Sequence, residues 1–273
     1  MHQVEYALEA VKQGSAVVGL RSKTHAVLVA LKRAPSELAS YQRKVLKIDH
    51  HLGMGFAGLT SDARVLSHYM RQLALSSRLM YTRPLPVSRL MGSLADRAQL
   101  NTMQYGKRPY GVGFLVIGMD DTGPHLYEFN PTGNCFEYYA MSLGARNQSA
   151  KTYLERHYGE FESTDADSLI VHGIAALRET LQQNKDLERD AVSVAIVGPG
   201  SDADTNSPAA RGAERFRVIE GADLASWFDR CVATNRLPPR SSGAAAPAAA
   251  PAHRSAGSAH PASASARRGR GPG

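Results

Sequence analysis

The chain has 273 residues, 43% of them hydrophobic and 21% charged, an ordinary composition for a soluble globular protein. No run approaches the ~18 apolar residues of a membrane span, and the first residues do not resemble a secretory leader, so we expect no membrane partner. The formal net charge is +7, but five arginines lie past Pro239 without any acidic residue, and residues 1–239 carry only +2, which argues against a nucleic-acid partner.

Residues 1–57 predict one helix followed by two β-hairpins. Val4, Leu8 and Val11 recur at helical spacing, and Gly14 supplies a C-terminal stop. Short apolar runs separated by polar turns then indicate paired strands. The predicted helix covers residues 2–13, and the predicted strands cover residues 15–20, 26–31, 44–49 and 52–57.

Two longer helices are predicted next. Thr60 or Ser61 is the expected side-chain cap of the first, and Asp62 suits the positive end of its dipole. Ser88 is expected to open the second helix, because it follows two prolines. The apolar faces consist of Leu66, Met70 and Leu73 in the first helix, and of Leu90, Met91, Leu94 and Ala98 in the second.

The remaining pattern alternates strands and helices again. Strands are predicted over residues 112–118, 125–129, 136–140 and 192–196, the last of them half-buried, and helices over 149–157 and 169–181. Residues 215–219 predict an edge strand and residues 222–228 a short helix. The Ala, Pro, Ser and Arg-rich remainder has no periodicity and is expected to be disordered.

This order predicts an α/β (α+β) fold, specifically a four-layer αββα sandwich of two antiparallel sheets flanked by helices. We expect one domain over residues 1–232 and a disordered tail over residues 233–273. Cys135 and Cys231 lack partners at disulfide or metal-ligand spacing, and adjacent His50 and His51 cannot easily bind one ion. No glycine-rich segment has phosphate-loop spacing, so no cofactor is expected.

A series of short segments resembles the α-type subunits of the 20S proteasome core particle. Together these segments extend from Met1 to about Val197, in the order and at the spacing of that family. They are Gln3–Ala7, Glu9–Lys12, Gly14–Ser15, Ala57–Leu59, Asp62–Arg64, Arg108–Val112, Gly144–Arg146 and Tyr153–Arg156. Two further segments, Thr24–Arg33 and Arg83–Arg89, resemble the α type-1 branch. The resemblance implies an N-terminal-nucleophile-hydrolase-like fold.

The resemblance also implies that the chain is catalytically silent. In catalytic β-type relatives a threonine at the start of the first strand attacks the peptide carbonyl. That position matches Ser15, which lies inside the chain; the orienting aspartate matches Leu31, and an active-site serine matches Ala145. Only the lysine of the set, at Lys44, is present. The alternative is an active hydrolase that uses Ser15 after cleavage at Gly14.

In α-type subunits the matching lysine lines a pocket that takes the C-terminal carboxylate of an activator tail. The resemblance therefore implies that Lys44 binds this carboxylate, and that Glu5, Gly14 and Gly58 surround the pocket. Judged from the residues alone, Lys44 would be a solvent-exposed lysine at a strand edge.

The implied role is structural: one position in a seven-membered α ring that supports assembly, substrate entry and activator docking in ubiquitin-dependent degradation. The implied partners are neighbouring α subunits, β subunits and the C-terminal tails of regulatory-particle ATPases, in the cytoplasm and nucleus. The family carries a gate-forming segment ahead of the Gln3–Ala7 motif, which we expect to be missing here.

Overall fold

A computed structural model describes residues 2–34, 36, 38–181, 187–199 and 216–236. Within these residues, no helix has the length and apolar character needed to cross a membrane. The predicted division of the chain at residue 232 stays a prediction, because residues from 237 on lie outside the described part. Cys135 and Cys231 are both free, as the sequence predicts.

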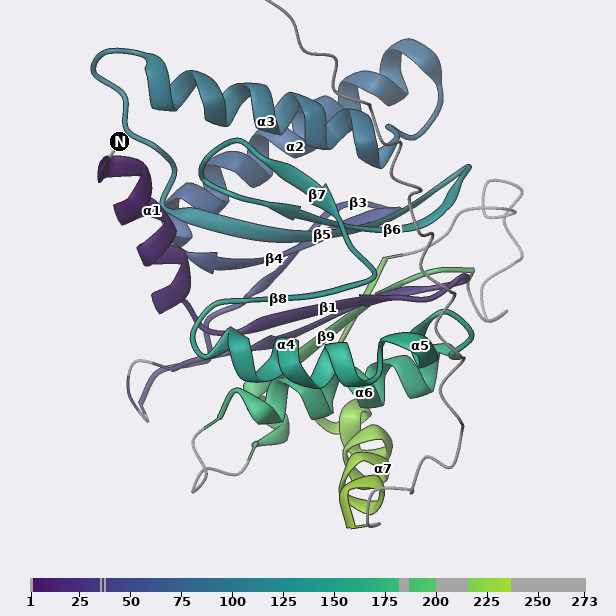
Figure 1. Cartoon of the computed structure of the whole chain (residues 1–273). Coiled ribbons are helices and arrows are strands. Elements are labelled where there is room, and N and C mark those ends of the chain that lie inside the picture. Colours follow the sequence, from purple (N-terminus) through teal and green to yellow (C-terminus); the bar gives the residue numbers. More distant parts are fainter. Residues whose placement is uncertain (1, 35, 37, 182–186, 200–215, 237–273) are drawn as a thin grey trace, which may run out of the picture. The chain divides into compact units, whose positions relative to one another are not determined.

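Two five-stranded antiparallel sheets lie face to face with helices on their outer faces, which confirms the predicted sandwich (Figure 1). One sheet has the order β10-β9-β2-β1-β8 and the other β3-β4-β5-β6-β7. The strands are β1 Val17–Arg21, β2 Ala26–Leu31, β3 Val45–Asp49, β4 Leu52–Gly58, β5 Val112–Asp120, β6 Gly123–Phe129, β7 Cys135–Glu137, β8 Ala140–Leu143, β9 Val192–Val197 and β10 Arg217–Glu220. The helices are α1 His2–Gln13, α2 Thr60–Tyr81, α3 Val87–Met103, α4 Asn147–Arg156, α5 Tyr158–Phe161, α6 Ala166–Glu179 and α7 Ala225–Arg236, with 3-10 turns at Arg189–Ala191 and Gly221–Leu224.

Three apolar clusters hold the layers together, and the two-residue period of each strand decides which side chain enters which cluster. In β2, Leu28 joins the cluster between the sheets, whereas Val27 and Val29 join the cluster beneath α4, α6 and α7. In β5, Leu115 joins the cluster between the sheets, and Phe114 joins the cluster beneath α2 and α3. The central strands are therefore apolar on both faces.

The single strand predicted over residues 136–140 is wrong. These residues end β7 and begin β8, which belong to different sheets. The Tyr138 N–H donates to the Leu126 carbonyl in one sheet, and the Tyr139 carbonyl accepts from Arg21 in the other. Because the run contains neither glycine nor proline, nothing local marks the point at which the chain crosses between sheets.

Strand β9 is buried on both faces rather than half-buried. Ser193 and Ala195, expected on an exposed face, are 1% and 0% exposed. Ala195 packs in the cluster between the sheets. The alternation of valine with small residues predicts one solvent-exposed face. In the structure the small residues instead allow close packing against the second sheet.

The predicted helix caps are also wrong. Leu59 is the N-cap of α2 and Pro86 that of α3, and neither helix has a side-chain cap hydrogen bond at that position. The Thr60 hydroxyl accepts from Gln42 instead, at 2.8 Å. The first N–H of α3, on Val87, donates to the Asp120 carboxylate at 3.3 Å. A carboxylate distant in sequence thus does the capping that a local serine was expected to do.

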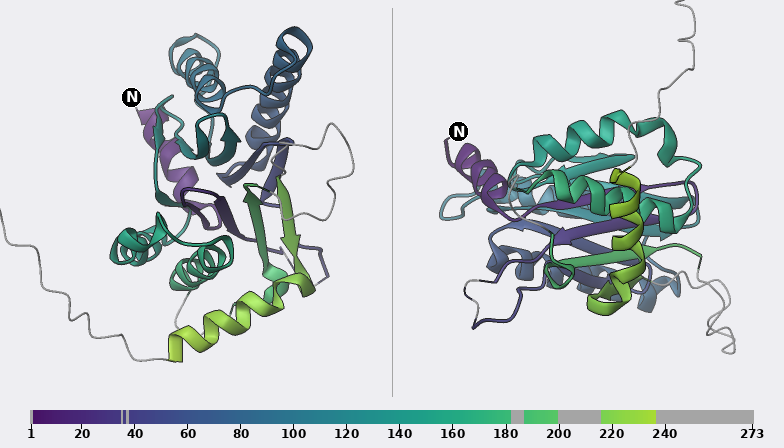
Figure 2. Two further views of the ribbon diagram at one scale, coloured as in Figure 1. Left: turned by 90° about the vertical axis from the view of Figure 1, so that its right-hand side faces the viewer. Right: turned by 90° about the horizontal axis from the view of Figure 1, so that it is seen from below.

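Figure 2 shows α1 at one end of the sandwich, apart from the helices that cover the outer faces of the sheets. Helix α1 packs on β4 and β5, and Val11 enters the cluster between the sheets. Its end at Gln13 leads through residues 14–16 into β1. Gly14, one of the residues expected to form the functional site, therefore lies where α1 joins the sheets.

Candidate functional site

The junction between α1 and β4 brings two of the predicted site residues, Gly14 and Gly58, into contact. A β-carbon at Gly14 would lie 2.4 Å from the Gly58 nitrogen. Gly58 has φ +112°, and a β-carbon there would lie 2.4 Å from the Gly111 carbonyl oxygen. Three backbone segments thus approach too closely for any side chain. This close approach explains why both positions are glycine.

Lys44 lies immediately before β3, beside the same part of β4. Its carbonyl accepts from the Phe56 N–H at 3.3 Å, two residues before Gly58. The residue is only 5% exposed, and its Nζ lies 4.8 Å from the centre of the Phe56 ring. The expectation that holds for the residue type alone, a solvent-exposed strand-edge lysine, is wrong.

The surroundings of Lys44 destabilise the charged form of its side chain. Burial, with a smaller contribution from the positive charge of Arg33, lowers the Lys44 pKa to about 8. Within the described part of the chain no carboxylate forms an ion pair with this ammonium group. The Phe56 ring offers a partial, cation–π compensation. A carboxylate from another molecule would stabilise the charged form of Lys44 by pairing with its ammonium group.

Glu5 is the predicted site residue that the structure does not bring to the others. Its side chain is 70% exposed on α1, and its Oε2 lies 3.3 Å from the His2 Nδ1. No ion pair between Glu5 and Lys44 occurs among the described residues. Glu5 therefore lies on the outer surface of α1, on the helix that leads into Gly14.

No group within the described residues forms a hydrogen bond that could activate the Ser15 hydroxyl. Ser15 is 2% exposed, and its Oγ has no hydrogen-bond partner in the described part of the chain. The Leu31 N–H donates to the Ala16 carbonyl at 2.9 Å, and the Ala145 N–H donates to the Gly14 carbonyl at 2.7 Å. The positions expected to hold an aspartate and a serine therefore do lie beside the start of β1, but they carry no acid, base or hydroxyl.

The structure adds Asp62 and Arg108, whose contact holds the loop before β5 against the start of α2. The Nη1 and Nη2 atoms of Arg108 both donate to the Asp62 carboxylate, at 2.7 and 2.9 Å. The Gly111 N–H donates to the same carboxylate at 3.0 Å, and the Gly111 carbonyl accepts from Leu59. These bonds hold the Asp62 pKa below its usual value despite burial. The sequence pattern indicated only a helix-dipole role for Asp62.

Replacing Asp62 by alanine is expected to destabilise the fold by about 1–3 kcal/mol, because it leaves the buried Gly111 N–H without its acceptor. The Asp62 pKa is lowered, so the ionised carboxylate stabilises the fold fully above the ordinary carboxyl pKa. This stabilisation is lost as the pH falls through the lowered value. Urea unfolding of the full chain at neutral and acidic pH measures both effects. Asp96→Ala, at an exposed position on α3, is the control.

The chain matches a protein-family model described as proteasome subunit over residues 11–197. It is 50% identical over 246 residues to a probable proteasome subunit alpha type-6 of Schizosaccharomyces pombe, covering 90% of this chain and 86% of that protein. It is 47% identical over 230 residues to proteasome subunit alpha type-1 of Dictyostelium discoideum, covering 84% and 88%. It is 54% identical over 200 residues to proteasome subunit alpha type-6 of Saccharomyces cerevisiae, covering 72% and 85%.

Proposed function

Because the chain belongs to the proteasome α-subunit family, we propose that it is a non-catalytic structural subunit of the α ring of a 20S core particle. The observation that carries the non-catalytic part is the buried Ser15 side chain: its amine is in the peptide bond with Gly14, and its Oγ has no hydrogen-bond partner among the described residues. Peptide hydrolysis is then the work of threonine-type subunits elsewhere in the particle. The relatives carry both type-1 and type-6 names, so the type-1 branch stays a prediction.

The exposed apolar residues support the predicted contacts with other subunits. Several large apolar side chains on α2 and α3 are about half exposed or more. They are Leu75, Leu79, Met80 and Tyr81 toward the C-terminal end of α2, and Leu100 and Met103 toward the C-terminal end of α3. We propose that the β subunits contact the layer formed by these two helices, and that neighbouring α subunits lie beside α1, where Tyr6 is 72% exposed.

The experiment that tests this function is the native mass and subunit composition of the complex captured by the full chain, tagged after Gly273. A particle of stacked seven-membered rings that contains threonine peptidases is the expected result. A free monomer contradicts the α-ring role. Intact-mass measurement of the same sample tests the alternative, because an active hydrolase would begin at Ser15 after loss of the segment before it.

For the site itself, we propose that Lys44 binds the C-terminal carboxylate of an activator tail, such as that of a regulatory-particle ATPase. The buried ammonium group, which has no carboxylate partner among the described residues, supports this, because a carboxylate ion pair would offset its desolvation. Gly14 and Gly58 support the site indirectly, because they allow the end of α1, the end of β4 and the loop before β5 to pack closely together. Glu5 lies further away, on the exposed surface of α1, where it contributes a negative charge near the site.

This proposal predicts a pH dependence of docking. The Lys44 pKa of about 8 means that the free site is charged at neutral pH and loses its proton as the pH rises through that value. Binding of a fluorescent activator-tail peptide to the particle is therefore expected to weaken from about pH 8 upward, whereas an exposed lysine would hold its charge to about pH 10. Flat binding up to pH 9.5 contradicts a role for Lys44.

We further propose that the chain acts in ubiquitin-dependent degradation and is located in the cytoplasm and nucleus. The family resemblance supports both proposals. Cell fractionation of the tagged chain tests the location, and recovery only from a secretory compartment contradicts it. Deletion of residues 240–273 tests whether the arginine-containing tail directs nuclear accumulation.

A further inference from the structure

Two histidines and a glutamate converge on the outer side of the helical layer formed by α4, α5 and α6, far in sequence from Lys44. His157 follows α4, Glu160 lies in α5, and His172 lies on α6. The Glu160 Oε2 is 3.2 Å from the His157 Nδ1 and 3.7 Å from the His172 Nε2. The three ligand atoms all lie within 4.8 Å of one another.

Two of these distances fit a single metal ion, and rotation of the partly exposed side chains can bring the histidine nitrogens closer together. Nitrogen and oxygen ligands lie about 2.0–2.2 Å from Zn²⁺, so two of them at a tetrahedral angle are roughly 3.3 Å apart. Both distances from Glu160 are near this value.

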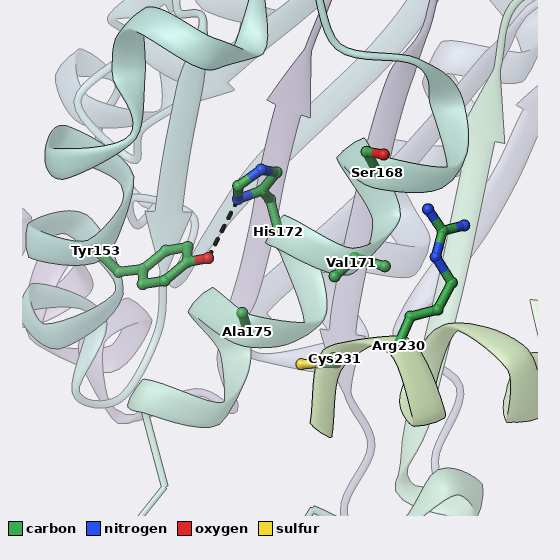
Figure 3. A pocket seen from close by; sticks show the side chains of 7 residues that line it. All are labelled: Tyr153, Ser168, Val171, His172, Ala175, Arg230 and Cys231. Atoms are coloured by element: carbon green, nitrogen blue, oxygen red, sulfur yellow. Dashed lines mark hydrogen bonds between the residues drawn. The ribbon is translucent and has the colours of Figure 1, made fainter. Parts of the chain in front are cut away.

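Tyr153 holds the imidazole of His172 in a suitable orientation (Figure 3). The Tyr153 hydroxyl lies 3.2 Å from the His172 Nδ1. When Nδ1–H donates to this hydroxyl oxygen, Nε2 keeps its lone pair and faces Glu160. The Tyr153 ring also packs on the His157 ring, with centroids 4.6 Å apart. Metal-binding histidines are commonly oriented by such a partner on the second ring nitrogen.

The cluster is sheltered on one side and open on the other. The His172 side chain is 20% exposed and the His157 side chain 34%, whereas that of Glu160 is 62% exposed. His172 and Tyr153 also line a cavity of about 230 Å³ that extends along α6 to Cys231 on α7. An ion bound here would keep open positions for water, as sites with two histidines and one carboxylate do.

We propose that His157, Glu160 and His172 form a binding site for one divalent transition-metal ion, most suitably Zn²⁺. Two imidazoles and one carboxylate favour such an ion over Mg²⁺ or Ca²⁺, which prefer oxygen ligands. The bound ion ties the segment that holds His157 and Glu160 to α6. Its role is structural, and it does not depend on the proposed α-ring function.

The test uses the full chain in the complex that it forms, freed of metal with a chelator and then titrated with Zn²⁺ alone. Retained zinc is counted by mass spectrometry after dialysis for the wild type, His172→Gln, Glu160→Gln and the control His50→Gln, which changes an exposed turn residue. Other subunits contribute the same background in every sample. The wild type and the control are expected to retain one more Zn²⁺ per copy of this chain than the two site variants.

Equal zinc retention in the wild type and Glu160→Gln overturns the proposal. That variant changes an exposed side chain, so it remains informative if His172→Gln fails to fold. Tyr153→Phe keeps the ring but removes the hydroxyl, and it is expected to weaken zinc affinity about 10–100-fold while the count at saturation stays the same. Unchanged affinity in that variant would overturn the orienting role of Tyr153.

Discussion

Replacing Gly58 by alanine is expected to destabilise the fold by about 2–6 kcal/mol, a large part of the total stability of an ordinary domain. Two costs combine at this position. The φ of +112° is strained for any L side chain, which costs about 1–3 kcal/mol. The new β-carbon would also lie 2.4 Å from the Gly111 carbonyl oxygen, and overpacking of this kind costs a further 1–3 kcal/mol or so.

Two other glycines separate these costs. Gly123 has φ +120° but open space around its β-carbon position, so Gly123→Ala should show the conformational cost alone. Gly92, inside α3, has open space and no positive φ, so Gly92→Ala should be neutral or slightly stabilising. Urea unfolding of the full chain and its incorporation into the complex are the measurements. If Gly58→Ala is as stable as Gly123→Ala, the close approach to Gly111 does not constrain the site.

The second large effect is expected at Lys44. Lys44→Met keeps the length and packing of the side chain over Phe56 but removes the charge that the activator carboxylate requires. A hydrogen bond to a charged group contributes about 1.5–3 kcal/mol, so affinity for the tail peptide should fall about 10–100-fold. Activator-stimulated peptide hydrolysis should fall with it, while unstimulated hydrolysis and ring assembly stay unchanged.

Lys47→Met is the matched control, because Lys47 lies three residues further along, in β3, with an exposed side chain. Lys44→Arg keeps the charge but not the compact ammonium group, so it tests whether charge alone is sufficient. Stimulation that survives in Lys44→Met at the wild-type level contradicts the docking role. Loss of assembly in that variant, in contrast to Lys47→Met, would instead assign Lys44 to the core of the subunit.

The periodicity of the sequence determined much of the fold, because local pattern fixes local structure. Helix α1 and strand β2 have the predicted bounds, and the two layers of helices and two sheets follow from the order of the elements. The family resemblance assigned Gly14 and Gly58 to one pocket, and Leu31 and Ala145 to active-site positions of catalytic relatives. In the structure Gly14 lies against Gly58, and Leu31 and Ala145 lie beside the start of β1, while the pocket itself stays a prediction.

Only the tertiary structure decided which side chains lose contact with water and which distant groups meet. Lys44 has the polarity of a surface residue, yet packing over Phe56 buries it and lowers its pKa. The capping of α3 by Asp120 and the meeting of Glu160 with His172 likewise join residues that no local pattern connects. Burial and electrostatic partners depend on long-range packing, so the sequence alone determined the elements and their order, and the folded structure determined the chemistry of the sites.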